Sequence, residues 1–211
     1  MGPARRAGIA LLEGMGDGGE PRLLIAILAL GALLLAGCRR EAPKPLYAVG
    51  EFSFTDQNGA RFGSQDLQGQ VWVAAFFFTR CPTVCPRITA RMKAAGEEAK
   101  QQKIALRLVS ISVDPENDTP DVLKAYATKN GLDLARWSLL TGDYEAIKGT
   151  TLEGFKIGLE GKADANAPDF GILHGSHLVL VDKAGMIRGY YKSSDDAEMK
   201  KLLEDAAALG R

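Results

Sequence analysis

Cysteine and histidine are scarce in this sequence, which has three cysteines and two histidines among its 211 residues. Secreted domains that depend on disulfides usually spread several cysteine pairs over distant segments, so this number excludes a disulfide-stabilised scaffold. An excess of charge of one sign is lacking too, because 26 basic and 26 acidic residues give a net charge of zero. Nucleic-acid binding calls for a basic surface, and no nucleic-acid partner is therefore expected.

The longest apolar run, at residues 23–37, is also short. A membrane-spanning helix needs roughly 20 apolar residues, whereas this run has the length of a signal-peptide core. It ends in Leu35-Ala36-Gly37-Cys38, which resembles the bacterial lipobox, whose cysteine becomes the first mature residue and carries a lipid. We therefore expect residues 1–37 to be a leader and Cys38 to anchor an exported lipoprotein to a membrane, facing the periplasm or another extracytoplasmic side. A short membrane anchor or a buried helix stays open, because Arg39-Arg40 would also suit a stop-transfer signal.

The rest of the chain has the length of one domain, since domains usually hold ~100–200 residues. Residues 38–46 contain prolines and charges, which favours a short tether after the lipidated cysteine. Residues 47–211 are the expected folded domain.

Hydrophobic patterning in this domain predicts alternating strands and helices. The apolar runs Val71–Phe78 and Ile104–Val113 are typical of strands buried on both faces. Asn58-Gly59 marks the turn of an amino-terminal β-hairpin, whereas residues 154–168 show weak periodicity and are expected to be an exposed excursion. Further strands are expected at residues 137–140, 172–181 and 187–191, and helices at 84–102, 119–130, 143–148 and from a cap at 193–196 to about 209. This order implies an α/β fold with a central mixed sheet flanked by helices, which a thioredoxin-like fold satisfies.

The two remaining cysteines, Cys81 and Cys85, lie where an apolar run ends and helical spacing begins. A disulfide this local would close a very small loop and stabilise little, so the pair indicates chemistry, either metal binding or electron exchange. If the helix begins near Pro82, both cysteines lie on one face of its first turn, where unpaired N–H groups favour negative charge. Both thiols are therefore expected to ionise more readily than a free cysteine. The spacing alone does not decide between metal binding and electron exchange.

The two histidines, His174 and His177, lie in one expected strand. Positions three apart on a strand point to opposite faces, so only one of them can face the cysteines, and spacing does not say which. Arg80, directly before Cys81, is interpreted as an exposed loop charge.

Three segments resemble the Sco/SenC family, named for synthesis of cytochrome c oxidase. Cys81-Pro-Thr-Val-Cys85-Pro86 is similar to its Cys-Pro-x-x-Cys-Pro motif, and Ser112–Pro120 is similar to its Ser-x-Asp-Pro-x-x-Asp-Thr-Pro segment. The family's histidine precedes a Leu-Val/Ile strand and a turn glycine. His174 stands at the matching offset from Leu180-Val181 and Gly185, whereas His177 does not.

The resemblance implies a thioredoxin-like domain that binds copper, as Cu(I) and/or Cu(II), through Cys81, Cys85 and His174. It also implies delivery of copper to the dinuclear centre of a cytochrome c oxidase subunit, with upstream copper donors and thiol reductants as further partners. Two thiolates and one imidazole suit Cu(I), although zinc accepts the same residues. The chain departs from the family at Arg80, where histidine is common, and in its additional His177.

The expected activity is therefore primarily that of a metallochaperone. One alternative is a thiol–disulfide oxidoreductase in which Cys81 and Cys85 form a reversible disulfide and reduce the oxidase subunit's copper-site cysteines. The usual redox motif has two residues between its cysteines rather than three, which argues mildly against this alternative. A thiol peroxidase is disfavoured, because Thr79 stands two residues before Cys81 instead of three.

Overall fold

The computed structural model describes residues 41–160, 173–174 and 176–211. The expected leader at 1–37, the expected lipidation site Cys38 and residues 161–168 of the expected excursion lie outside the described residues. Within the described part, no helix is both long enough and apolar enough to cross a membrane.

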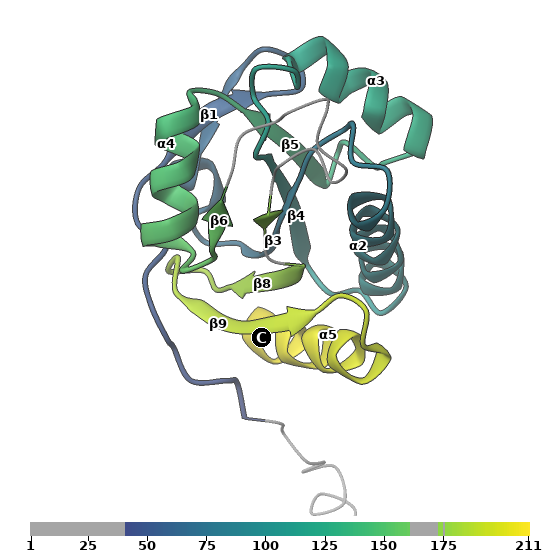
Figure 1. Cartoon of the computed structure of the whole chain (residues 1–211). Helices are drawn as coiled ribbons and strands as arrows, with labels where there is room; N and C mark the ends of the chain where they lie inside the picture. The colour runs from purple at the N-terminus through teal and green to yellow at the C-terminus, as the bar shows by residue number, and fades with distance from the viewer. Residues whose placement is uncertain (1–40, 161–172, 175) are drawn as a thin grey trace, which may run out of the picture. The chain divides into compact units, whose positions relative to one another are not determined.

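A seven-stranded mixed sheet forms the centre of the domain, in the order β2-β1-β5-β4-β3-β8-β9. The neighbours β3, β4 and β5 are parallel, and the strands at both edges pair antiparallel. The strands are β1 (Ser53–Asp56), β2 (Arg61–Gly63), β3 (Val71–Phe77), β4 (Leu106–Ser112), β5 (Trp137–Thr141), β8 (His177–Val181) and β9 (Ile187–Lys192). The expected central mixed sheet and amino-terminal hairpin are confirmed (Figure 1).

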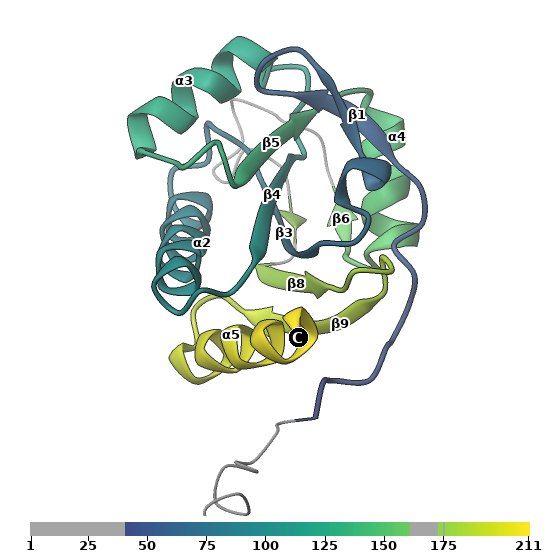
Figure 2. The same cartoon turned by 180° about the vertical axis from the view of Figure 1, so that it is seen from behind.

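Four α-helices flank this sheet, with α2 and α4 on opposite sides of it (Figures 1 and 2). They are α2 (Val84–Gln101), α3 (Pro120–Asn130), α4 (Tyr144–Gly149) and α5 (Asp196–Gly210). Local signals set their ends: the side chains of Thr119, Asp143 and Asp195 cap the amino termini of α3, α4 and α5. Gly131 ends α3 with a φ of 59°, a left-handed conformation that glycine adopts without steric cost. The four expected helices are confirmed, and their ends lie within two residues of the expected positions.

Strand β3 is buried along its whole length, as its apolar sequence predicts. Its side chains alternate between two cores. On one face the rings of Trp72 and Phe76 contact Phe155 at centroid distances of 5.9 and 5.1 Å, and on the other Phe77 contacts Tyr126 of α3 at 5.4 Å. Phe52 completes the first group, which we call the aromatic cluster (Phe52, Trp72, Phe76 and Phe155).

Two expectations about the later part of the chain are wrong. Phe155 and Ile157 fall in the expected exposed excursion, yet they are 0% and 6% exposed, because Phe155 fills the aromatic cluster. The single strand expected at 172–181 is interrupted. Its start, β7 (Leu173–His174), pairs with β6 (Leu159–Glu160) in a separate two-stranded sheet, and only β8 belongs to the central sheet.

The expected tether contacts the domain through its last residues. The Leu46 N–H donates to the carbonyl of Ile187 at 2.8 Å, and Arg188 donates to the carbonyl of Pro43 at 2.6 Å. The chain is therefore held against β9 from Pro43 onward, before the expected start of the domain at residue 47.

Candidate thiol and metal site

Cys81 and Cys85 lie beyond the carboxyl end of β3, the edge of an open α/β sheet at which ligands usually bind. Helix α2 begins at Val84, because Thr83 has φ −127° and ψ −66°, outside the helical region. A start near Pro82, the condition under which both cysteines would share one face of the first turn, is therefore not met: Cys85 lies in the first turn of the helix, and Cys81 lies in the loop before it.

One hydrogen bond brings the two cysteines together. The Cys85 N–H donates to Sγ of Cys81 at 3.4 Å, and the thiols are not joined in a disulfide. Cys81 is partly exposed, whereas Cys85 is 1% exposed. A reactant from solvent can thus reach Cys81 directly, whereas the protein covers Cys85.

The two thiols differ in acidity. Burial acts to raise the pKa of Cys81, but hydrogen bonds from the backbone N–H groups of Cys85, Thr83 and Val84 outweigh it, and the pKa is lowered. Burial raises the pKa of Cys85 strongly, and the neighbouring Cys81 and the charge of Asp118 add to the effect. The expectation that both thiols ionise readily is thus correct for Cys81 and wrong for Cys85.

A buried carboxylate fixes the loop that leads to Cys81. Asp118 is 0% exposed and accepts hydrogen bonds from the backbone N–H and the hydroxyl of Thr79, at 3.0 and 2.5 Å. The Ser112 hydroxyl donates to the same carboxylate at 2.6 Å. Burial raises the pKa of Asp118, although these hydrogen bonds oppose the shift. The carboxylate therefore ties the end of β3 to the end of β4.

A second carboxylate, Asp114, holds the residue before Cys81. Arg80 donates to Asp114 at 2.9 Å, and the Asn117 side chain donates to the other oxygen at 2.8 Å. Arg80 is 34% exposed and Asp114 2%, so the interpretation of Arg80 as an exposed loop charge is wrong. We call Thr79, Ser112, Asp114 and Asp118 the carboxylate cluster.

Ser112–Pro120 enters the sequence-based predictions only through the family resemblance, and no contact of these carboxylates with the loop before Cys81 is among them. The signal was present: Asp114 and Asp118 directly follow a buried strand that runs parallel to β3. Because parallel strands end at the same edge of a sheet, their following residues meet those that follow β3.

The two histidines lie in different sheets. The backbone of His174 pairs with Leu159 in the small sheet, and His177 is an exposed residue that begins β8 opposite Lys192. The side chain of His174 lies outside the described part of the structure. Among the side chains that are described, no three of Cys, His, Asp and Glu are grouped to hold a metal ion. The third ligand thus stays a prediction.

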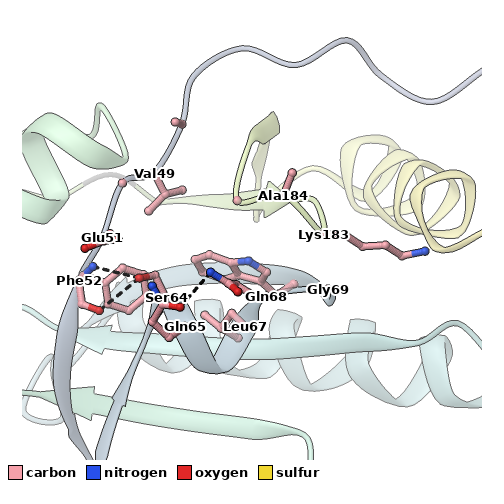
Figure 3. A pocket seen from close by; sticks show the side chains of 14 residues that line it. Val49, Glu51, Phe52, Ser64, Gln65, Leu67, Gln68, Gly69, Lys183 and Ala184 are labelled. Atoms are coloured by element: carbon pink, nitrogen blue, oxygen red, sulfur yellow. Dashed lines mark hydrogen bonds between the residues drawn. The ribbon is translucent and has the colours of Figure 1, made fainter.

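A separate hollow lies at the other end of β3, where Trp72 in its lining is about 17 Å along the strand from the carboxyl end at Phe77. It has a volume of about 440 Å³ and lies between the segment around Phe52, the turn around Leu67 and the β8–β9 turn at Lys183 (Figure 3). Its lining contains no cysteine or histidine, so it offers no chemistry of the kind found at the cysteines.

Comparison with known proteins gives a consistent answer. A family model described as SCO1/SenC matches residues 40–208. The SCO1 protein homolog of Bacillus subtilis is 33% identical over 176 residues, which cover 82% of this chain and 89% of that protein. A SCO1/SenC family lipoprotein from Bacillus anthracis is 35% identical with a TM-score of 0.73, over 81% of this chain and 99% of the other.

Two further solved structures are similar over most of their length. BsSco, described as a member of the Sco family of cytochrome c oxidase assembly proteins with a disulfide switch, is 32% identical with a TM-score of 0.69, covering 82% of this chain and 98% of its own. ScoI of Bradyrhizobium japonicum, solved with copper bound, is 26% identical with a TM-score of 0.58, covering 74% and 98%. These neighbours and the sheet order confirm the thioredoxin-like fold. The chain belongs to the SCO1/SenC family.

Proposed function

We propose that this protein is a copper chaperone of cytochrome c oxidase assembly, binding copper as cargo through Cys81, Cys85 and His174 and delivering it to the dinuclear copper centre of an oxidase subunit. The observation that carries the proposal is the cysteine pair: a partly exposed thiol, Cys81, accepts a hydrogen bond from the backbone N–H of Cys85, whose own thiol is buried, beyond the carboxyl end of β3 in a family fold. Relatives described as oxidase assembly proteins, or solved with copper bound, support it.

The donor set fits copper. Two sulfurs and one imidazole are soft ligands that suit Cu(I), and three ligands leave a position open to an incoming ligand of the acceptor. A thiol must lose its proton to bind a metal, so copper binding would displace the proton of the buried Cys85. His174, in the two-stranded sheet of β6 and β7, would supply the third ligand.

Copper titration of the reduced protein tests this proposal. We expect one Cu(I) per chain in the wild type, loss of binding in Cys81→Ser with Cys85→Ser, and binding weakened at least about tenfold in His174→Ala. His177→Ala is the matched control and should bind as the wild type does. Full affinity in His174→Ala would exclude the three-ligand site.

Membrane attachment is part of the proposal. A lipid on Cys38 would hold the domain on the extracytoplasmic side of a membrane, and the similarity to a solved family lipoprotein supports this arrangement. In membrane fractions, Cys38→Ser should release the protein into the soluble fraction, and retention would contradict lipid anchoring.

A second function, reduction of the oxidase subunit's copper-site cysteines, is favoured by the different acidities of the two thiols. In a reducing dithiol, an accessible thiol of lowered pKa attacks the partner's disulfide, and a buried thiol then resolves the mixed disulfide. Iodoacetamide should therefore alkylate Cys81 at least about 100-fold faster than Cys85 at pH 7. Equal rates, measured by mass spectrometry in a Cys38→Ser background, would remove the support for this function.

A further inference from the structure

The surface beside the cysteines contains a hollow that the proposed copper site does not use. It has a volume of about 580 Å³ and lies between the first two turns of α2, the start of β8 and the link from β9 to α5. Its lining residues are Val84, Arg87, Ile88, Ala90, Arg91, Ser176, Ser193 and Ser194. Val84, which lines the hollow, directly precedes the buried Cys85 in the first turn of α2, so the hollow begins one residue from the cysteine pair.

One stripe of α2 supplies the apolar and basic character of this hollow. Val84, Arg87 and Arg91 are spaced by three and four residues and therefore lie on one face of the helix. Val84 is 44% exposed, which is unusual for a valine beside a buried core. This face of α2 therefore presents an exposed apolar side chain, Val84, beside Cys85 in the sequence and two arginines one and two turns further along the helix.

The cations on this stripe are available to a partner. Within the described residues, Arg87 is exposed and lies within ion-pair distance of no carboxylate. Arg91 pairs with Asp196 at 2.7 Å, but Asp196 is 87% exposed, and such surface pairs contribute little. The first acidic residue of α2 is Glu97, beyond the hollow. The chain as a whole carries no net charge, so the basic character here is local.

We infer that this hollow, lined by Val84, Arg87 and Arg91, docks an acidic segment of the protein that exchanges copper or electrons with Cys81. An apolar side chain of that segment would cover Val84, its carboxylates would pair with the two arginines, and the serine hydroxyls opposite can bond its backbone. The inference deepens the proposed function by stating the chemistry of its partner. An anionic membrane is the weaker occupant, because the apolar contact lies in a concavity rather than on a protruding face.

Thiol exchange with two model peptides tests this surface. The peptides contain one cysteine and one leucine and differ only in having aspartates or lysines at the other positions. With protein oxidised to the Cys81–Cys85 disulfide, the peptide thiolate attacks Sγ of Cys81, the disulfide bond breaks, and Cys85 leaves as a thiolate that takes a proton from water. The readout is the ratio of the two second-order rate constants, acidic peptide over basic peptide, each corrected for that peptide's rate with a small-molecule disulfide. A change in the reactivity of the protein's own disulfide between variants affects both rate constants equally and cancels in this ratio.

At low salt we expect this ratio to be at least about 10 in the wild type and to fall below 1 in Arg87→Glu with Arg91→Glu. The matched control is Arg61→Glu with Lys183→Glu, two exposed residues away from the hollow, which should leave the ratio within about twofold. An unchanged ratio in the Arg87/Arg91 variant would overturn the inference. A second result would also overturn it. If the variant no longer sedimented with phosphatidylglycerol vesicles while its peptide ratio stayed constant, the surface would be assigned to lipid binding.

Copper titration of the same variant separates this inference from the proposed function. The Arg87/Arg91 variant should still bind one Cu(I), since neither arginine belongs to the proposed ligand set, and a urea titration of the same variant reports whether it is folded. Conversely, a wild type that binds no copper but keeps the peptide ratio would remove the chaperone proposal and leave the docking surface standing.

Discussion

The aromatic cluster and the carboxylate cluster both lie next to β3 and are largely buried, yet one is apolar and the other is polar. The first packs rings at centroid distances of 5.1 to 6.5 Å and needs no polar partner. The second buries two carboxylates and satisfies them with hydroxyls, an N–H and one arginine. Burying apolar surface stabilises a fold, whereas burying a charge costs free energy unless it is well bonded. We therefore infer that the carboxylate cluster serves mainly to position the loop that leads to Cys81, and the variants below test this inference.

Removal of Phe155 should give the largest loss of stability, because it disrupts the packing of the aromatic cluster. Phe155→Ala leaves a cavity against Trp72 and Phe76, and we expect the free energy of unfolding to fall by about 3–5 kcal/mol in urea titrations. Leu152→Ala, one turn earlier and 38% exposed, is the control and should cost less than about 1 kcal/mol. Equal losses in the two variants would show that the cluster is not a packed core.

Removal of the Asp118 carboxylate should have a smaller effect. Asp118→Ala strands the N–H and hydroxyl of Thr79 and the hydroxyl of Ser112, which costs about 1–3 kcal/mol. Unlike Phe155→Ala, this variant should also change the iodoacetamide reactivity of Cys81, because the loop before it loses its attachment. Unchanged reactivity, with stability reduced as expected, would contradict a positioning role.

The same residue predicts a pH dependence of definite sign. Because burial raises the pKa of Asp118 in the folded state, the native protein binds this proton more tightly than the unfolded chain. The resulting stabilisation is complete below pH about 4 and is lost as the pH rises through the folded-state pKa. Asp118→Asn cannot titrate, so its unfolding free energy relative to the wild type should increase over that rise. A constant difference from pH 4 to 8 would contradict the shifted pKa.

The smallest effect is expected at the next residue, Thr119. It also makes a side-chain hydrogen bond to the backbone, but it is exposed where Asp118 is buried, so the two variants separate the role of the buried carboxylate from that of the segment. Its exposed hydroxyl caps α3 by accepting from the Val122 N–H at 3.4 Å. Thr119→Ala should cost about 0.5–1 kcal/mol and leave the reactivity of Cys81 unchanged. A change in Cys81 reactivity as large as that of Asp118→Ala would mean that the whole segment, rather than the carboxylate, positions the loop.

Features encoded by local sequence were predictable. The run Val71–Phe77 and the cap Thr119-Pro120 specify a strand and a helix start through nearest-neighbour preferences, and the structure has both. The paired thiols were found because their spacing is itself the signal.

Features that depend on distant contacts were not predictable in the same way. Phe155 stands among glycines and charges, and its burial follows from rings about 80 and 100 residues earlier in the chain. The interruption between β7 and β8 depends on β6 as a pairing partner, which periodicity within the segment does not show. The pKa of Cys85 could not be assigned either, because helix position predicts a lowered value and burial, a tertiary property, reverses it.

The division of the strands into two sheets bears on how cargo would be released. The cysteines follow β3 of the seven-stranded sheet, whereas the backbone of His174 belongs to the two-stranded sheet of β6 and β7. In the proposed site, a metal ion bound by Cys81, Cys85 and His174 would link the seven-stranded sheet to the two-stranded sheet. Loss of the His174 ligand would break no ladder of the central sheet, so the acceptor could displace this imidazole before the two thiolates without unfolding the domain.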